Sequence, residues 1–331
     1  MSAAEAVAVV MFVAITAYAV FGGADFGSGV WDLTAGGPHK GAPTRRLIDH
    51  AIGPVWEANH VWLIFVLVFL WTGFPQPFAT LMNDLAIPFW LAGLGITARG
   101  AGFAFRKFSP TMRGARTAGV IFASASLLTP FFLGAIAGAV ASGRVVTDGS
   151  HGLWRSWLGP TSILGGLLAV ATCTLLAGIF LAAEAAKIGD VDLAESLRDK
   201  SLVGATITGL IALLGIPVLL ADSETLSAGL LGRALPIVAI SAFAGLWTIR
   251  ALWTRKLRLA RVTSVIAVAA IVIGWGVAQH PWILVDQVKI SEGAGASSSL
   301  IGLLIAGALA GVLVLPPLIY LFSLAEDSHP H

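Results

Sequence analysis

Residues 45–65 read RRLIDHAIGPVWEANHVWLIF, so charged and amide side chains run directly into a hydrophobic segment. Gly53-Pro54 fits a helix start, because proline at the first helical position has a preset φ and lacks an N–H that would have no partner. Ionisable residues at the membrane-embedded start of a helix are costly, and function is the default hypothesis for them. The stretch predicts a membrane helix that carries chemistry at its entrance.

Helical spacing groups the polar side chains of this stretch. Glu57 and His60 share one face of the predicted helix, while Trp56, Asn59 and His60 share the neighbouring face. A carboxylate, an imidazole and an amide would then cluster where lipid begins. The alternative is that these groups only sit in the headgroup region, with the tryptophans as interfacial anchors.

The composition is that of a polytopic membrane protein. Of the 331 residues, 57% are hydrophobic and 11% are charged, whereas soluble domains carry about 25% charged residues. The mean hydropathy is +0.87. A net charge of +2 without a basic-aromatic patch gives no indication of a nucleic-acid partner. The single cysteine, Cys173, comes without CxxC or CxxCH, which argues against a cysteine-bound metal, an iron–sulfur cluster or covalently attached haem.

Apolar runs of about 20 residues predict nine spanning helices in an all-α fold. Their expected bounds are 5–31, 55–73, 78–104, 114–142, 159–187, 201–221, 232–252, 257–279 and 299–324. Phe180-Leu-Ala-Ala-Glu184 matches Phe21-Gly-Gly-Ala-Asp25 in spacing, which favours a parallel internal repeat, unless Glu184 only marks the membrane edge. We expect two four-helix bundles and one peripheral helix, divided as 1–142, 143–279 and 280–331.

Lysine and arginine set the orientation, because they are enriched in cytoplasmic segments. The segments after odd-numbered spans hold fifteen of them and the opposite side holds four. The fifteen are Lys40, Arg45, Arg46, Arg106, Lys107, Arg113, Arg116, Lys187, Arg198, Lys200, Arg250, Arg255, Lys256, Arg258 and Arg261, and the four are Arg144, Arg155, Arg233 and Lys289. We therefore expect the N-terminus outside, the C-terminus in the cytoplasm, and residues 45–57 on the cytoplasmic side.

Charged residues within the spans give further site candidates. Asp25 lies in GGADFGSG, in the cytoplasmic third of the first span, where the glycines predict a close helix contact. Asp84 and Arg99 of the third span cannot pair, because their spacing along a helix is about 22 Å. We expect Arg99 to pair with Glu57 or Asp25, and Asp84 to be hydrated or to face another subunit. The fourth span, with its small residues and Pro130, predicts close packing, and we assign it no chemistry.

Five segments together resemble subunit II of the cytochrome bd family of quinol oxidases. They are GGADFGSG, RRLIDHAIGPVWEANHVWLIF, ARGAGFAFR, LLTPFFLGAIAGAVASGR and GWGVAQHPWIL, in the family's order and spacing over essentially the whole chain. The resemblance implies a complex in the bacterial plasma membrane that oxidises quinol and reduces oxygen to water. It also implies a larger partner, subunit I, that carries the haems, with this chain as scaffold and cytoplasmic proton route. Some family members bind a structural quinone.

Within that resemblance, Glu57 and Asp25 match acidic positions of the family's second and first spans. Their implied role is proton transfer, with Trp56, Asn59 and His60 in support and Arg99 as charge partner. Physical chemistry agrees, because a buried carboxylate whose neutral form is favoured by desolvation can accept a proton and pass it on. Many members have an acid two residues before the arginine that corresponds to Arg106, but Ala104 stands there in this chain, which puts a second proton-handling role in doubt.

The sequence predicts no metal site and no haem site of the chain's own, and no residue is assigned to a cofactor. Of its seven histidines, we expect only His60 to be membrane-embedded. Two rival functions remain open. A proton- or ion-coupled transporter would also use intramembrane acids and internal repeats, although no pair of broken helices is predicted at matching midplane positions. A purely structural assembly subunit is the third alternative.

Overall fold

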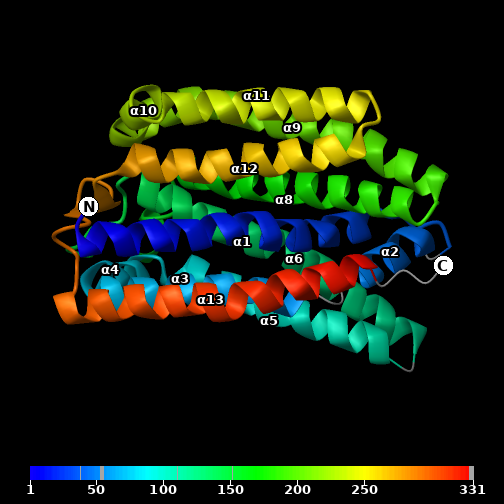
Figure 1. Cartoon of the computed structure of the whole chain (residues 1–331), viewed down its shortest axis with the longest axis horizontal. Helices are drawn as coiled ribbons and strands as arrows, with labels where there is room; N and C mark the ends of the chain where they lie inside the picture. The colour runs from blue at the N-terminus through cyan, green and yellow to red at the C-terminus, as the bar shows by residue number, and fades with distance from the viewer. Residues whose placement is uncertain (38, 53–55, 110, 151, 328–331) are drawn as a thin grey trace.

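The computed structural model describes residues 1–37, 39–52, 56–109, 111–150 and 152–327. Long helices lie side by side along one direction (Figure 1). In chain order the elements are α1 (Ala3–Thr34), α2 (Ala42–Ile52), α3 (Trp56–Gly73), α4 (Pro75–Asp84), α5 (Ala86–Phe108), α6 (Met112–Ala141), α7 (Gly152–Arg155), α8 (Pro160–Lys187), α9 (Val191–Asp222), α10 (Glu224–Leu231), α11 (Leu235–Trp253), α12 (Leu257–Gln279), β1 (Trp282–Leu284), β2 (Val288–Lys289) and α13 (Ser297–Asp327). Strands β1 and β2 pair antiparallel in a short hairpin.

The chain is an all-α, multi-pass membrane protein, as predicted. Within the described residues, seven helices are long and apolar enough to cross a membrane, and an eighth span is obtained if the bent pair α3–α4 is counted. Helix α5 is not among them, and it carries Arg99 within its apolar stretch. Its 23 residues still extend about 34 Å, which is enough to span. The predicted count of nine is therefore approximate.

Local sequence signals explain where several helices begin. Helix α1 starts with a capping box, in which the Ser2 side chain accepts a hydrogen bond from the Glu5 backbone and the Glu5 carboxylate accepts one from the Ser2 backbone. Pro160 stands in the first turn of α8, where its missing N–H costs nothing. Asp190 caps α9. Residues 188–200, which lie between the predicted fifth and sixth spans, are therefore mostly the first part of helix α9.

The predicted third span, 78–104, is wrong at its outer end, because α4 ends at Asp84 and a separate helix, α5, begins at Ala86. Helix α3 ends at Gly73, and α4 then turns away from it by 118°. Pro75 and Pro77 both lie in the first turn of α4, and two prolines so close together cannot continue the preceding helix. Asp84 is buried at the end of α4, where its Oδ2 accepts a hydrogen bond from the Val146 backbone N–H at 3.1 Å. The expectation that Asp84 is hydrated or faces another subunit is also wrong.

Helix α1 lies at the centre of the packing and contacts α3, α6, α8 and α12. A Cβ atom added at Gly27 would overlap the backbone carbonyl of Cys173 on α8. Gly134 of α6 and Gly165 of α8 approach each other in the same way. The close helix contacts predicted for the first and fourth spans are confirmed, and they bring polar side chains of different helices within hydrogen-bonding range.

The basic segments gather at one end of the molecule, as the charge count predicts. The end of α1, helix α2 and the α5–α6, α8–α9 and α11–α12 junctions lie at that end (Figure 1). The start of α1, helices α4 and α10 and the β1–β2 hairpin lie at the other (Figure 1). Which end faces the cytoplasm stays a prediction, and so does the division at residues 142 and 279.

We predict from this arrangement that reporter fusions after His50, Met112, Asp192 and Lys256 will report cytoplasm, because all four sites belong to the basic end. Fusions after Gly149 and Gly293 should report the outside. Paired phosphatase and fluorescent-protein fusions measure this directly. One robustly inverted site would show that a span is miscounted.

Candidate functional site

A buried ion pair joins α1 to α5. Arg99 Nη2 lies 2.6 Å from Asp25 Oδ1, and the two side chains are 1% and 2% exposed. The same nitrogen donates to the backbone carbonyl of Asp25 at 3.3 Å. The prediction that Arg99 can pair with Asp25 is confirmed. Because removing two charges from water is costly, the pair depends on further contacts that satisfy the guanidinium.

Helix α6 supplies those contacts. Arg99 Nε donates to Ser126 Oγ at 3.0 Å, and that hydroxyl donates to the carbonyl of Phe122 at 2.7 Å. The guanidinium also lies 5.0 Å from the ring centroid of Phe122 and 5.2 Å from that of Phe26, within cation–π range. The fourth span, to which the sequence analysis assigns no chemistry, thus positions the charge partner of Asp25.

A second ion pair repeats the first one two turns further along both helices. Asp32 of α1 pairs with Arg106 of α5, and each stands seven residues after its counterpart in the first pair. The Phe122 ring lies 5.0 Å from the Arg106 guanidinium as well, so one aromatic ring sits between the two arginines. Helices α1 and α5 are thereby fixed in register by two matched pairs.

Helix α2 adds further contacts to these two ion pairs at the basic end of the molecule. Arg45 Nε donates to Asp32 Oδ1 at 2.8 Å, and Arg45 also binds the carbonyl of Gly36 at 2.7 Å. Asp49, which is 51% exposed, pairs with Arg106. Burial raises the pKa of the Asp49 carboxyl above its usual value, although Arg106 acts in the opposite direction. These charges connect the water-exposed end of the molecule to its interior.

Asn59 and His60 of α3 face α1, the helix that carries Asp25. Asn59 is 3% exposed, and its Nδ2 donates to the carbonyl of Phe21 at 3.4 Å. His60 is half-buried, with its Nδ1 3.4 Å from the Tyr18 hydroxyl oxygen. The structure therefore brings two of the predicted supporting residues to the same helix as the predicted acid.

The side chains of Trp56 and Glu57 lie outside the part of the chain that is described. Both residues belong to the first turn of α3, and the predicted helix start at Gly53-Pro54 falls on the undescribed residues 53–55. Contacts of Glu57 with Arg99 or Asp25 therefore stay a prediction. Within the described residues, no group of three or more histidine, cysteine, aspartate or glutamate side chains could hold a metal ion.

Two buried oxygen atoms, one on α1 in the Asp25–Arg99 pair and one on α3, have no hydrogen-bond donor among the described residues. They are Asp25 Oδ2 and Asn59 Oδ1. A buried acceptor without a donor costs about 1–3 kcal/mol, and more when it is charged. A water molecule that donates to Asp25 Oδ2 would remove that cost. The arrangement can therefore hold a carboxylate in place through one oxygen while the other accepts a proton.

Sequence reasoning did not single out Tyr18, Arg106 or Asp49 as parts of this site. Tyr18 could have been found from its spacing, because it stands seven residues before Asp25 and Asp32 stands seven residues after it, so that all three share one face of α1. The same spacing relates the two arginines of α5. Asp49 carries no such pattern, since its contact depends on how α2 folds back onto α5.

Comparison with known proteins decides the family. Residues 3–325 match the family model described as cytochrome bd terminal oxidase subunit II. The chain belongs to this family. It is 25% identical over 183 residues to a Bacillus subtilis (strain 168) protein described as cytochrome bd ubiquinol oxidase subunit 2. That match covers 55% of this chain and 54% of the relative, so the chain matches about half of the relative's length.

The fold of this subunit II chain is also found in an experimental structure. A chain of the bd oxidase from Geobacillus thermodenitrificans has a TM-score of 0.82 to it, with 22% sequence identity and 98% of both chains covered. At this identity the likeness concerns the fold. The buried charges thus belong to a subunit II chain of a membrane oxidase family, and their function has to be inferred from their chemistry.

We predict that Arg99→Met destabilises the full-length chain by about 3–5 kcal/mol, because it leaves the buried Asp25 carboxylate without its partner. The double variant Arg99→Met with Asp25→Asn should recover part of that loss, since no uncompensated charge remains. Thermal unfolding of the chain in detergent measures both. Arg113→Met, at an exposed arginine of the same end, is the matched control. If Arg99→Met unfolds with the wild type, the pair is not ionic.

Proposed function

We propose that this chain is the scaffold and proton-delivery subunit of a cytochrome bd-type oxidase complex that oxidises quinol and reduces oxygen to water. Its partner is a larger subunit I that carries the haems. The complex lies in the bacterial plasma membrane, with the N-terminus of this chain outside and its C-terminus in the cytoplasm. Family membership supports the complex, and the charge count supports the orientation.

One observation carries the proton-delivery role: Asp25 is buried, held by Arg99 through one oxygen, and has no donor among the described residues at the other. Oxygen reduction consumes protons, so the complex needs acids that take protons up inside the membrane. A carboxyl group fixed in position but open at one oxygen suits that task. A purely structural ion pair would favour donors at both oxygens, because each orphan atom is costly.

Glu57 is the proposed first station of the route, with Asp25 as the next. A carboxyl in the first turn of α3 can sense both water and the protein interior. The positive helix N-terminus opposes its neutral form by about 0.3–1 kcal/mol, while desolvation favours that form. Such opposed effects suit reversible proton transfer near neutral pH. Trp56, Asn59 and His60 form the setting of this transfer.

No residue of this chain is assigned to a haem or a quinone. Within the described part, one histidine, His60, lies in a candidate spanning segment, and its ring packs against Tyr18 and Phe26. Its Nδ1 lies 3.4 Å from the Tyr18 hydroxyl oxygen, so this ring nitrogen already has a partner within the chain. Haem chemistry is therefore left to the partner subunit.

The rival function, an ion-coupled transporter, receives less support. Such transporters often bind their substrate where two spans are broken near the membrane midplane. Within the described residues one helix pair, α3–α4, is sharply bent, and α3 is 18 residues, about 27 Å, long before the bend. The break thus lies near a membrane surface.

We predict that Glu57→Gln yields an assembled, haem-loaded complex with clearly reduced oxygen consumption, because glutamine keeps the size and hydrogen bonding of glutamate but cannot carry a proton. Glu57→Asp should retain more activity. Oxygen-electrode rates with quinol, normalised to haem, measure the effect. The control is Asp192→Asn, which removes an exposed acid at the same end and should leave the rate unchanged. A wild-type rate in assembled Glu57→Gln would exclude Glu57 as an obligatory station.

A further prediction concerns the partner. This chain expressed alone should be colourless, because its described residues offer no pair of axial haem ligands facing each other. Haem absorbance and quinol oxidase activity should appear only when a second, haem-ligating polypeptide is co-expressed. Optical spectroscopy of the purified lone chain is the measurement, and stoichiometric haem in it would contradict the division of labour proposed here.

A further inference from the structure

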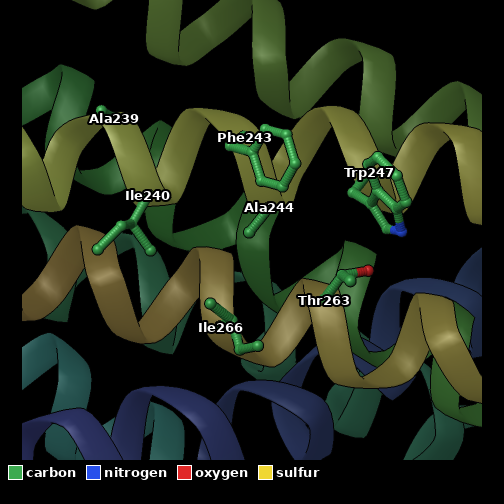
Figure 2. Close-up of a pocket in the computed structure, with 7 residues that line it drawn as sticks. All are labelled: Ala239, Ile240, Phe243, Ala244, Trp247, Thr263 and Ile266. Atoms are coloured by element: carbon green, nitrogen blue, oxygen red, sulfur yellow. The ribbon is translucent and has the colours of Figure 1, made fainter.

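A groove runs along the outer surface between α11 and α12, away from the buried ion pairs. Its volume is about 500 Å³. Figure 2 shows the residues that line it, which include Ile240, Phe243, Ala244 and Trp247 of α11 and Thr263 and Ile266 of α12. The rings of Phe243 and Trp247 stack with their centroids 5.4 Å apart. The Thr263 hydroxyl is engaged 2.8 Å from that of Thr248, so the groove presents mainly hydrocarbon.

Two basic residues continue the lining of this groove towards the basic end of the molecule. Arg250 follows Trp247 by one turn on α11 and so falls on the groove-lining face. Lys256 is the N-cap residue of α12, and its backbone N–H donates to the carbonyl of Ala251 at 2.8 Å, which places it beside the last turn of α11. Their side chains are exposed, and no acidic side chain of the described chain is paired with them. Neighbouring Arg255 differs, since it pairs with Glu195 at 3.2 Å. Two positive charges are thus available where the groove ends.

The length of the groove matches one leaflet of a bilayer. Ala239 lines its far end, and Arg250, eleven positions further on, lies about 16 Å from it along the helix. The hydrocarbon core of a membrane is about 30 Å thick, so this is roughly half of it. A transmembrane helix of another protein would need contact across both leaflets. An acyl chain that enters from the basic end would fill the groove, and the chain and the groove would both end near the middle of the bilayer.

We propose that the α11–α12 groove binds an anionic phospholipid of the leaflet at the basic end. One acyl chain lies in the groove against Phe243 and Trp247, and the phosphate lies between Arg250 and Lys256. Basic residues at the membrane surface attract anionic headgroups, and basic pockets between spanning helices bind them specifically. The charge selects the headgroup, while the apolar groove selects a lipid over a free phosphate.

The test is native mass spectrometry of the whole complex in detergent, titrated with phosphatidylglycerol or with phosphatidylcholine of the same acyl chains. Phosphatidylglycerol should bind, and phosphatidylcholine should bind much more weakly. Arg250→Gln with Lys256→Gln should raise the dissociation constant for phosphatidylglycerol by about tenfold or more, because each basic residue near an anionic headgroup contributes substantially. Arg113→Gln with Arg116→Gln removes two exposed charges of the same end outside the groove and should change nothing.

A second variant tests the groove itself. Ala239→Phe places a ring at its far end without changing the charge, and because Ala239 is exposed the fold should tolerate it. It should weaken binding of phosphatidylglycerol while the soluble anion glycerol phosphate remains unbound to any variant. The proposal is overturned if both lipids bind equally, if the Arg250–Lys256 double variant binds like the wild type, or if the retained molecule is a quinone or a polypeptide.

Discussion

The ion pair between Asp25 and Arg99 constrains the rest of the structure, because an arginine cannot be deprotonated inside a protein. Its charge must be balanced wherever the chain buries it. Balancing it requires that α6 pack against both α1 and α5 in one register, with Ser126 and two aromatic rings completing the surroundings of the guanidinium. Gly29 of α1 permits this packing, because a Cβ atom there would collide with Ser126, which hydrogen-bonds to Arg99.

Exposure falls steadily along the acidic residues that pair with the two arginines of α5. The Asp49 side chain is 51% exposed, that of Asp32 is 6% exposed and that of Asp25 is 2% exposed. The arginines alternate with these acids, so no carboxylate of the series is buried without a cation beside it. Negative charge can thus exist at increasing depth without the desolvation cost of an isolated ion. The gradient links the surface of the molecule to its interior.

The sequence was sufficient for the helices and for one contact of the site. Hydropathy predicted the position of most spans, and the lysines and arginines predicted which span ends lie together. Both signals depend only on residues that are close in the sequence. Depth limited the partners of Arg99 to Asp25 or Glu57, and the structure shows the pair with Asp25. Ser126 and Phe122 could not be predicted, because periodicity tells which residues share a face but not which helix that face meets. The break at Leu85, directly after Asp84, was missed because its apolar flanks resemble one span.

The polar face of α1 does not continue across the membrane. Tyr18, Asp25 and Asp32 follow one another at intervals of seven residues, and the next positions in the same series are Met11 and Ala4, both buried and neither polar. From Asp32 to Tyr18 this face extends about 21 Å, less than the full hydrocarbon thickness. A transporter needs polar groups that reach both surfaces. A chain whose polar face stops part-way suits delivery of protons sideways, to a partner that consumes them within the membrane.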